Sequence, residues 1–364
     1  MKPTRPQVIL GVTALISSLS WALADDGRHE PIIPGLPATP TLSVSTVPSN
    51  GDQNPYGVAF VPRGFPEGGG LAPGDIIVSN FNDSNNVQGT GTTIVAVTPD
   101  GDVSVFFQGQ PGLGLTTALG VLKRGFVLVG NVPTTDGTCN TIQPTSLLIV
   151  DRNGSQVSAL SDDHFLDGPW DLTIHDEGEL AQVFVSNVLS GTVTRIDLRT
   201  ALEGTPTVES MTQIASGYGH ACNAAAVVVG PTGLAYDEDG DILYVASTAD
   251  NAIFAVPGAR KAASDAGRGS LIYQDDTHLH GPLGLVLTQN GDLVTANGDA
   301  VNPDPNQPSE LVEFTPTGEF VAQFSVDPSQ GAAFGMALRP TRFAAVDDAT
   351  NMLDIWTLAG TTMH

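Results

Sequence analysis

Residues 230–257 read GPTGLAYDEDGDILYVASTADNAIFAVP, and this stretch contains the pattern that decides the fold. Three short runs within it, residues 233–236, 242–247 and 252–256, are rich in apolar, β-branched and aromatic side chains. Polar segments of Asp, Glu, Gly, Thr and Asn separate these runs, which is typical of strands joined by tight turns. Residues 270–274 supply a fourth apolar run. The stretch therefore predicts a four-stranded antiparallel meander.

The beginning of this unit recurs along the chain as a small or turn-forming residue, a bulky residue, Gly and an apolar strand. The Gly position falls at residues 57, 120, 171, 233, 284 and 335, with Asp171 in place of Gly in the third copy. Three of the five steps span 51 residues, and the two longer ones contain insertions at 63–73 and 216–226. A period near 51 with four strands per unit is the signature of propeller blades. A sandwich of unrelated strands, the alternative, has no reason to keep a fixed period.

The last repeat has room for only three strands after residue 335. The run TLSVSTV at residues 41–47, just before the first copy, can supply the missing outer strand. Such closure pairs the two ends of the domain and leaves no long free edge. We therefore predict an all-β fold, a six-bladed β-propeller of four-stranded antiparallel blades at residues 41–358. An N-terminal strand closes its last blade, and a C-terminal tail follows at residues 359–364.

The first residues of the chain have the features of an export signal. Residues 1–24 begin with Lys2 and Arg5, continue with apolar residues and end in the A-x-A sequence at residues 22–24. This order is that of a secretory signal peptide, and the apolar run is short for a membrane-spanning helix, the alternative. Residues 25–40 contain many Pro and are predicted to be a linker. We therefore predict a secreted or periplasmic protein with no stable membrane anchor after cleavage of the signal peptide.

The composition is strongly acidic. The chain has 39 Asp and Glu against 14 Lys and Arg, a net charge of −25, and loss of Lys2 and Arg5 with the signal peptide makes it −27. Such a surface repels nucleic acid and anionic membranes, so we predict no nucleic-acid partner. In a propeller, the last-to-first-strand connections and the second-to-third-strand loops emerge on one face, and the long segments of this chain fall there. We expect a small molecule or a protein partner on this long-loop face, because binding sites gather on loops held by a rigid scaffold.

Three histidines, His220, His278 and His280, are predicted on the long-loop face. In an extended segment His278 and His280 would point to the same side, and His220 could complete a three-nitrogen site for zinc or copper. The alternative is that they are exposed or hydrogen-bonded loop residues, because no metal-binding motif is matched. A divalent metal is therefore a candidate cofactor, although the sequence establishes none.

The two cysteines, Cys139 and Cys222, also lie in long segments of this face. In an exported protein they are candidates for a disulfide, although the third blade separates their loops. No nucleophile signature surrounds either cysteine, and the sequence contains no G-x-S-x-G, H-E-x-x-H, Rossmann or P-loop pattern.

Each predicted second strand ends in a polar side chain, as at Asn187, Asn297 and Asp347. Together these groups could present oxygen ligands to a cation, or each side chain could cap its own loop by bonding nearby backbone groups. Repetition of the feature in every blade favours the capping alternative.

The bulky residue of the repeat is aromatic at Tyr56, Trp170 and Phe334. These side chains should crowd the mouth of the central channel, with Asp171 as the nearest carboxylate. They would form either an apolar small-molecule pocket or a hydrophobic plug that packs the blades together.

The pattern PTGLAYDEDGDILYVA at residues 231–246 resembles NHL repeats. It is also similar to the gluconolactonase-like, senescence-marker-like and strictosidine-synthase-like propellers, with a bacterial exported member as the expected type. The resemblance covers residues 41–358 and implies the six-bladed architecture. It also implies, for the lactonases, a divalent cation at the channel mouth held by Glu, Asn and Asp, with one Asn at the bulky position of the repeat. In this chain that position holds no Asn and no acidic residue, being Tyr56, Leu119, Trp170, Thr232, Leu283 or Phe334. We therefore expect a binding or interaction module on the long-loop face, with a metal-dependent hydrolase of the lactonase type as the alternative.

Overall fold

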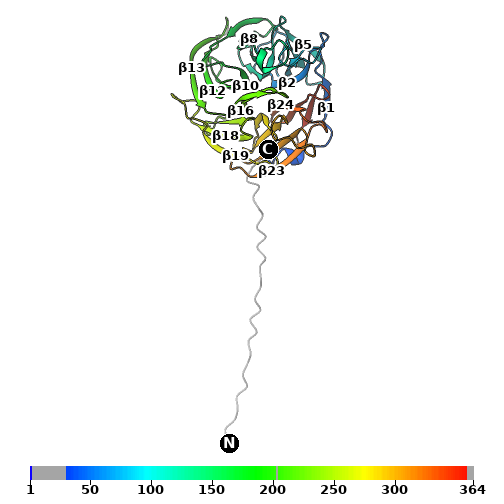
Figure 1. The fold of residues 1–364 in the computed structure, drawn as a ribbon, viewed down its shortest axis with the longest axis vertical. Helices are drawn as coiled ribbons and strands as arrows, with labels where there is room; N and C mark the ends of the chain where they lie inside the picture. Colours follow the sequence, from blue (N-terminus) through cyan, green and yellow to red (C-terminus); the bar gives the residue numbers. More distant parts are fainter. Residues whose placement is uncertain (2–29, 202–203, 359–364) are drawn as a thin grey trace.

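The structure is a computed structural model that describes Met1, residues 30–201 and residues 204–358. The predicted signal peptide, apart from Met1, and the predicted tail at 359–364 lie outside the described residues. Six four-stranded antiparallel sheets surround a central axis, as Figure 1 shows in a view along that axis. The predicted six-bladed propeller is therefore confirmed.

The strands follow one another from the axis outward in each blade. Blade 1 has β2 (Gln53–Phe60), β3 (Ile76–Asn82), β4 (Thr93–Val97) and β5 (Val103–Gln108). Blade 2 has β6 (Leu115–Leu122), β7 (Phe126–Asn131), β8 (Ser146–Asp151) and β9 (Gln156–Leu160). Blade 3 has β10 (Pro169–Asp176), β11 (Leu180–Asn187), β12 (Thr192–Arg199) and β13 (Thr207–Ser216). Blade 4 has β16 (Pro231–Asp237), β17 (Ile242–Ser247), β18 (Ala252–Pro257) and β19 (Ser270–Tyr273). Blade 5 has β20 (Pro282–Leu287), β21 (Leu293–Asn297), β22 (Glu310–Phe314) and β23 (Phe320–Ser325).

Blade 6 joins the two ends of the domain. It contains β24 (Ala333–Arg339), β25 (Arg342–Asp347) and β26 (Met352–Thr357), with β1 (Leu42–Ser45) as its outer strand. β1 pairs antiparallel with β26, from Leu42 opposite Ile355 to Ser45 opposite Met352. The N-terminal closure predicted from residues 41–47 is therefore correct, and it removes the free edge that β26 would otherwise present.

The repeated Gly marks where one inner strand approaches the next blade. A Cβ atom at Gly335 would lie 2.0 Å from the carbonyl oxygen of Tyr56, and one at Gly284 would lie 2.3 Å from that of Phe334. Any side chain at these positions would therefore force the inner strands apart, which is the physical reason that Gly recurs at this step of the repeat. The apolar faces of adjacent blades then pack together, as Ile77 of blade 1 does with Val127 of blade 2 in one buried cluster.

The described part of the predicted linker at 25–40 is docked on the propeller. It contains a short 3₁₀ helix, η1 (Ile33–Gly35). At the start of this helix the backbone N–H groups of Ile32 and Ile33 donate to the carboxylate of Glu313 at 3.0 and 2.8 Å. Ile33 is buried, and the indole of Trp356 donates to the carbonyl oxygen of Pro37 at 3.0 Å. Residues 32–37 therefore belong to the folded domain.

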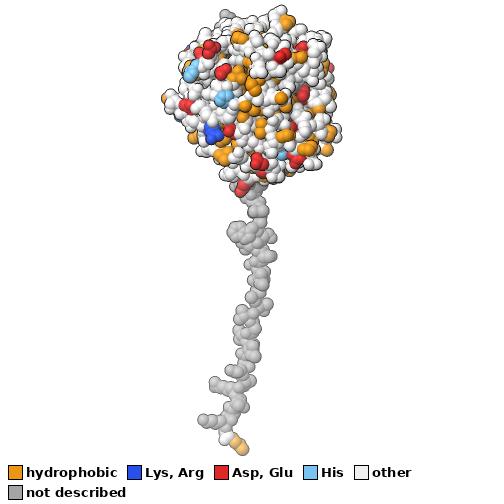
Figure 2. Space-filling view, in the orientation of Figure 1, with side chains coloured by type: hydrophobic (Ala, Val, Ile, Leu, Met, Phe, Trp, Pro, Cys, Tyr) orange, Lys and Arg blue, Asp and Glu red, His pale blue; other side chains and the backbone are white. Residues whose placement is uncertain are grey.

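Acidic side chains are spread over the face shown in Figure 2, and basic ones are few there. Among the residues that the structure describes, no helix is long and apolar enough to cross a membrane.

Candidate functional site

Aromatic side chains close the central channel. Tyr56 stacks on Phe81, with ring centroids 4.7 Å apart, and packs against Phe334 at 4.5 Å. Trp170 meets the edges of the Tyr56 and Phe81 rings at 6.1 and 5.6 Å. All four side chains are buried, with at most 8% of Phe334 exposed. Tyr56, Trp170 and Phe334 therefore form the hydrophobic plug that the sequence allowed, and they do not line an open mouth together. Phe81 was missed because it lies outside the repeated position.

A pocket of about 350 Å³ lies on the long-loop side of this plug. Its floor includes Tyr56, Phe334 and Leu283, and its walls come from the connections of blades 1, 5 and 6. The lining residues are Asn54, Tyr56, Gln88, Ala225, Ala226, Leu283, Gly298, Asp299, Pro303, Gln330, Gly331, Phe334 and Asp348. We refer to this cavity as the long-loop pocket.

Asp348 is the main ionisable group of the long-loop pocket. Burial raises the pKa of its carboxyl to about 7, and the neighbouring charge of Asp347 adds to the shift. Burial also raises the pKa of Tyr56, with the charge of Asp348 as the second cause. No hydrogen bond to the Asp348 carboxyl is formed within the described residues. The carboxyl is thus held in an unfavourable environment beside a phenol.

Two further polar side chains of the pocket are incompletely bonded. Asp299 accepts backbone N–H groups of Ser309 and Gly331 at 2.9 and 2.8 Å through Oδ2, whereas its buried Oδ1 has no partner among the described residues. Burial is the main cause that raises the pKa of Asp299. Asn54 adopts a left-handed backbone conformation (φ 60°), and its buried Oδ1 also lacks a partner within the described part of the chain. Buried polar groups without partners are rare in folded proteins and call for an explanation.

A disulfide-linked hairpin covers the pocket. β14 (Ala221–Asn223) pairs with β15 (Val227–Val229) outside the six blades, and Ala225 and Ala226 at its turn line the pocket. Cys222 of β14 is bonded to Cys139 of a second 3₁₀ helix, η2 (Cys139–Thr141), across a Cα–Cα distance of 5.5 Å. The predicted disulfide is therefore present, and it ties the insertion at 216–226 to a loop of blade 2.

The turn of this hairpin is strained. Val227 has φ 61°, and the N–H of Val228 donates to the carbonyl oxygen of Ala226 at 2.6 Å. A three-residue turn with positive φ at a β-branched residue is unfavourable. Val227 and Val228 compensate by packing in the same buried cluster as Tyr56 and Trp170. Gln88 fixes the turn further by donating to the carbonyl oxygen of Ala225 at 3.0 Å.

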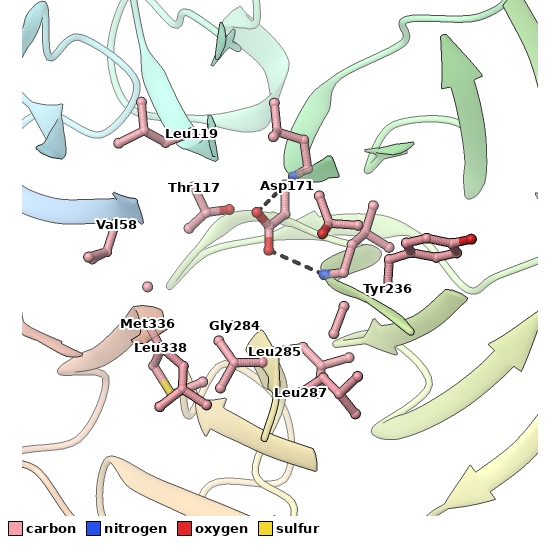
Figure 3. Close-up of a pocket in the computed structure, with 16 residues that line it drawn as sticks. Val58, Thr117, Leu119, Asp171, Tyr236, Gly284, Leu285, Leu287, Met336 and Leu338 are labelled. Carbon is pink, nitrogen blue, oxygen red and sulfur yellow. Dashed lines mark hydrogen bonds between the residues drawn. The ribbon is translucent and has the colours of Figure 1, made fainter. Parts of the chain in front are cut away.

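Asp171 lies in a second cavity, of about 270 Å³, formed by the inner strands on the other side of the plug. Its carboxylate accepts N–H groups of Leu172 and Leu234 at 2.7 and 3.3 Å, so it bridges blades 3 and 4 (Figure 3). Burial raises the pKa of Asp171 well above its usual value, and these two bonds oppose the shift. Figure 3 shows apolar side chains such as Val58, Leu285 and Met336 around the rest of this cavity. Of the predicted channel-mouth set, Tyr56 and Phe334 therefore line the long-loop pocket and Asp171 lines the second cavity. The remaining members line neither: Trp170, Asn187, Asn297 and Asp347.

The polar residues at the ends of the second strands cap nearby loops, which for Asn187 and Asn297 are the connections that enter their blades. Asn187 donates to the carbonyl oxygen of Phe165 at 3.1 Å, Asn297 bonds the backbone of His278 and His280, and Asp347 accepts from the Thr350 hydroxyl. Asn187 and Asn297 are fully buried and do not line the long-loop pocket. The structure therefore assigns the capping role to these side chains, and their placement at the channel mouth was wrong.

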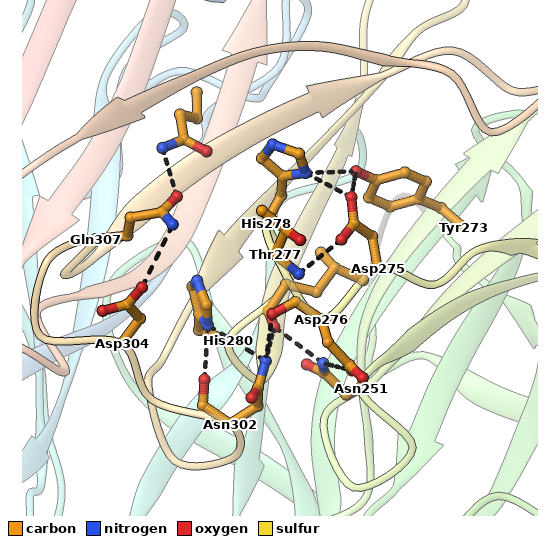
Figure 4. A network of polar contacts seen from close by, with 12 residues as sticks. Asn251, Tyr273, Asp275, Asp276, Thr277, His278, His280, Asn302, Asp304 and Gln307 are labelled. Atoms are coloured by element: carbon orange, nitrogen blue, oxygen red, sulfur yellow. Dashed lines mark hydrogen bonds and ion pairs between the residues drawn. The ribbon is translucent and has the colours of Figure 1, made fainter.

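The three histidines are not brought together. Residues 276–278 form a turn, so the extended geometry expected for His278 and His280 is absent. His278 bonds Asp275 at 2.5 Å and stacks on Phe320, whereas His280 is buried and contacts the carbonyl oxygen of Asn302 at 2.6 Å (Figure 4). His220 is exposed, with Nδ1 3.2 Å from the carbonyl oxygen of Tyr218. Within the described residues, no group of three or more His, Cys, Asp or Glu is arranged to hold a metal ion.

One feature of the sequence indicates Asp348 as a site residue, although the sequence analysis did not predict it. Asp348 follows Asp347 directly at the end of a second strand, and such a pair leaves one carboxylate free when the other caps the loop. Asn54 and Asp299 gave no comparable signal, because they come from different blades: Asn54 lies at the start of β2, and Asp299 lies in the connection between β21 and β22.

Comparison with known proteins supports the fold. No family model and no curated protein matches the chain. Among solved structures, virginiamycin B lyase from Staphylococcus aureus is 13% identical, with a TM-score of 0.51 over 87% of this chain and 99% of that one. A gluconolactonase from Xanthomonas campestris is 15% identical, with a TM-score of 0.52 over 85% and 87% of the two chains. A chain of the mitotic checkpoint complex is 12% identical, with a TM-score of 0.53 over 96% and 99%. Enzymes and components of protein assemblies therefore share this architecture, and at such low identity the likeness shows the fold alone.

Proposed function

We propose that this chain is an exported β-propeller that binds a small molecule in the long-loop pocket. The observation that carries the proposal is Asp348, whose carboxyl lines the pocket without a hydrogen-bond partner among the described residues and has a pKa raised to about 7. Partial burial of this carboxyl disfavours its charged form, and a carboxyl with a raised pKa beside a cavity favours a ligand-binding role.

The surrounding structure suits such a role. Blades 1, 5 and 6 fix the walls of the pocket, and the plug of Tyr56, Trp170 and Phe334 gives it a rigid floor. The turn of the hairpin β14–β15 lines the pocket through Ala225 and Ala226, and the hairpin is cross-linked by Cys139–Cys222. A preformed cavity that combines apolar and aromatic side chains with polar groups is typical of small-molecule sites, and this pocket has polar side chains at Asn54, Gln88, Asp299, Gln330 and Asp348. The disulfide supports export, because such bonds persist in oxidising compartments.

Lactone hydrolysis is the second candidate, and the same carboxyl favours it. A group with a pKa near 7 is suited to act as a general base at neutral pH. The gluconolactonase among the structural neighbours has the same fold. Such a reaction would require a divalent cation at oxygen ligands to polarise the lactone carbonyl, with Asn54, Asp299 and Asp348 as the available donors.

The test is a ligand screen of the mature chain by thermal shift and native mass spectrometry, with Asp348→Asn as the site variant. Asp239→Asn is the control, because Asp239 is exposed in the β16–β17 turn on the opposite face. We expect ligands that stabilise the wild type and the control but not Asp348→Asn.

Lactone hydrolysis that requires calcium, zinc or manganese and is lost in Asp348→Asn would establish the second candidate. If loss occurred only in Asp171→Asn or Asp347→Asn, the reaction would lie elsewhere. Absence of any ligand that distinguishes Asp348→Asn from the control would overturn the proposal.

A further inference from the structure

We propose that the long-loop pocket recognises a small organic cation carrying a substituted ammonium group, an inference that rests on the ligand-binding role proposed above. The pocket combines two carboxyl groups, two aromatic rings and no basic side chain, which together favour a compact positive charge with an apolar periphery.

The charge of the pocket favours a cation. Asp348 and Asp299 both line it, and none of the described residues of the lining is Lys, Arg or His. An anionic ligand would therefore meet two carboxyl groups without a compensating charge. The net charge of −25 on the whole chain adds a field that attracts cations and repels anions.

The apolar surfaces distinguish an organic cation from a bare metal ion. Tyr56 and Phe334 contact each other at a ring-centroid distance of 4.5 Å and both line the pocket, together with Leu283. Aromatic faces attract substituted ammonium groups through the cation–π interaction, and the alkyl substituents contact apolar walls. A hydrated divalent ion would gain little from these walls, because it requires six or more oxygen ligands.

The affinity should depend on the ionisation of Asp348. The titratable groups around it are Asp347 at the end of β25, Tyr56 on β2 and Asp299, which lines the same pocket from blade 5. Because the pKa of Asp348 is raised to about 7, the carboxyl is largely protonated at pH 6 and largely ionised at pH 8. A ligand with a permanent charge should therefore bind more tightly as the pH rises through this interval.

The experiment measures binding of choline and of its uncharged carbon analogue, 3,3-dimethylbutan-1-ol, to the mature chain by calorimetry at pH 6 and pH 8. We expect choline to bind, more tightly at pH 8, and the uncharged analogue to bind at least about tenfold more weakly, the scale of a partly screened ion pair. Asp348→Asn should weaken choline binding by a similar factor and abolish the pH dependence. Phe334→Leu, which keeps an apolar side chain without the ring, should weaken it roughly threefold to tenfold. Asp239→Asn should bind like the wild type.

Each outcome separates this inference from the proposed function. Equal affinity for choline and its uncharged analogue, or choline binding that Asp348→Asn leaves unchanged, would overturn the cation assignment. If neutral compounds or calcium bind with dependence on Asp348 while choline does not, the pocket is a ligand site and the cation inference is wrong. Failure of every probe to distinguish Asp348→Asn from Asp239→Asn would overturn both.

Discussion

Substitution of Asp348 by Asn should stabilise the protein at neutral and alkaline pH. Asp348 lies in a pocket where neither solvent nor a hydrogen-bond donor among the described residues fully compensates its charge. Asn has nearly the same shape and carries no charge, so the substitution removes the electrostatic cost and preserves the packing against Tyr56. Most single substitutions destabilise a protein, so an increase in the free energy of unfolding on replacing Asp348 by Asn would be unusual.

The magnitude follows from the pKa. The carboxyl titrates at 3.8 in the reference state and at about 7 in the folded protein. Because one pKa unit corresponds to about 1.36 kcal/mol, ionising Asp348 in the fold costs up to about 4 kcal/mol more than in the unfolded chain. The folded state holds an extra proton between about pH 4 and about pH 7, so the free energy of unfolding falls as the pH rises through this window and is constant above it. Water entering the pocket screens the charge, and we expect about 2–4 kcal/mol.

The assay is urea-induced unfolding of the mature wild type, Asp348→Asn and Asp239→Asn at intervals from pH 4 to pH 8.5. The difference in unfolding free energy between Asp348→Asn and the wild type should grow by about 2–4 kcal/mol between the two ends of the range. The exposed Asp239→Asn control should remain within about 0.5 kcal/mol of the wild type throughout.

Parallel stability curves for the wild type and Asp348→Asn would refute this reasoning, since the carboxyl would then have the same pKa in both states. A decrease in stability of Asp348→Asn at pH 8 would refute it in another way. Such a decrease would mean that the ionised Asp348 carboxylate has a stabilising partner in the folded protein. The argument that this carboxylate binds a ligand would then fail as well.

Two other substitutions and one deletion test the architecture. Replacing Cys139 and Cys222 by Ser opens a loop of 83 positions and should lower the unfolding free energy by up to about 4–5 kcal/mol; equal midpoints with and without reductant in the wild type would contradict this. Deleting residues 25–50 removes β1 and exposes the edge of β26, so the melting temperature of the whole domain should fall, and an unchanged melt would disprove closure. Glu313→Ala leaves the N–H groups of Ile32 and Ile33 without acceptors and should cost about 1–3 kcal/mol in urea titrations; no change would show that residues 32–37 contribute nothing to stability.

The fold was predictable because it is repeated. The spacing of the Gly positions reflects a close contact that every inner strand must make, as at Gly284 and Gly335, and a constraint of this kind leaves its mark in each blade. The strand deficit after residue 335 likewise located β1 correctly, since an unpaired outer edge must be satisfied by some other segment.

The site was harder to predict because it depends on features that occur once. The expected set mixed Asp171 with Asn187 and Asn297. Asp171 follows the plug residue Trp170 in β10 and lies on the other side of the plug, whereas Asn187 and Asn297 end second strands and are buried caps. The docked segment at residues 32–37 was taken for linker because its contacts depend on Glu313, which is 280 residues from Ile33 in the sequence. Pro-rich composition alone cannot distinguish a docked segment from a free one.

Several departures from regularity lie around the long-loop pocket, and others are found elsewhere in the described residues. Asp348 is a partly buried carboxyl whose pKa is raised, Val227 has a strained backbone in the turn beside the pocket, and Asn54 has a left-handed backbone and an unpaired buried oxygen. Each of these costs free energy, yet they come from β25–β26, the β14–β15 hairpin and the start of β2, which are far apart in the sequence. Strain that collects in one place from separate segments is expected where binding, rather than folding, has determined the residues. The insertion at 216–226, which interrupts the period, supplies β14 and hence one side of this cover. The insertion at 216–226 therefore lies at the long-loop pocket, where we expect the ligand to bind.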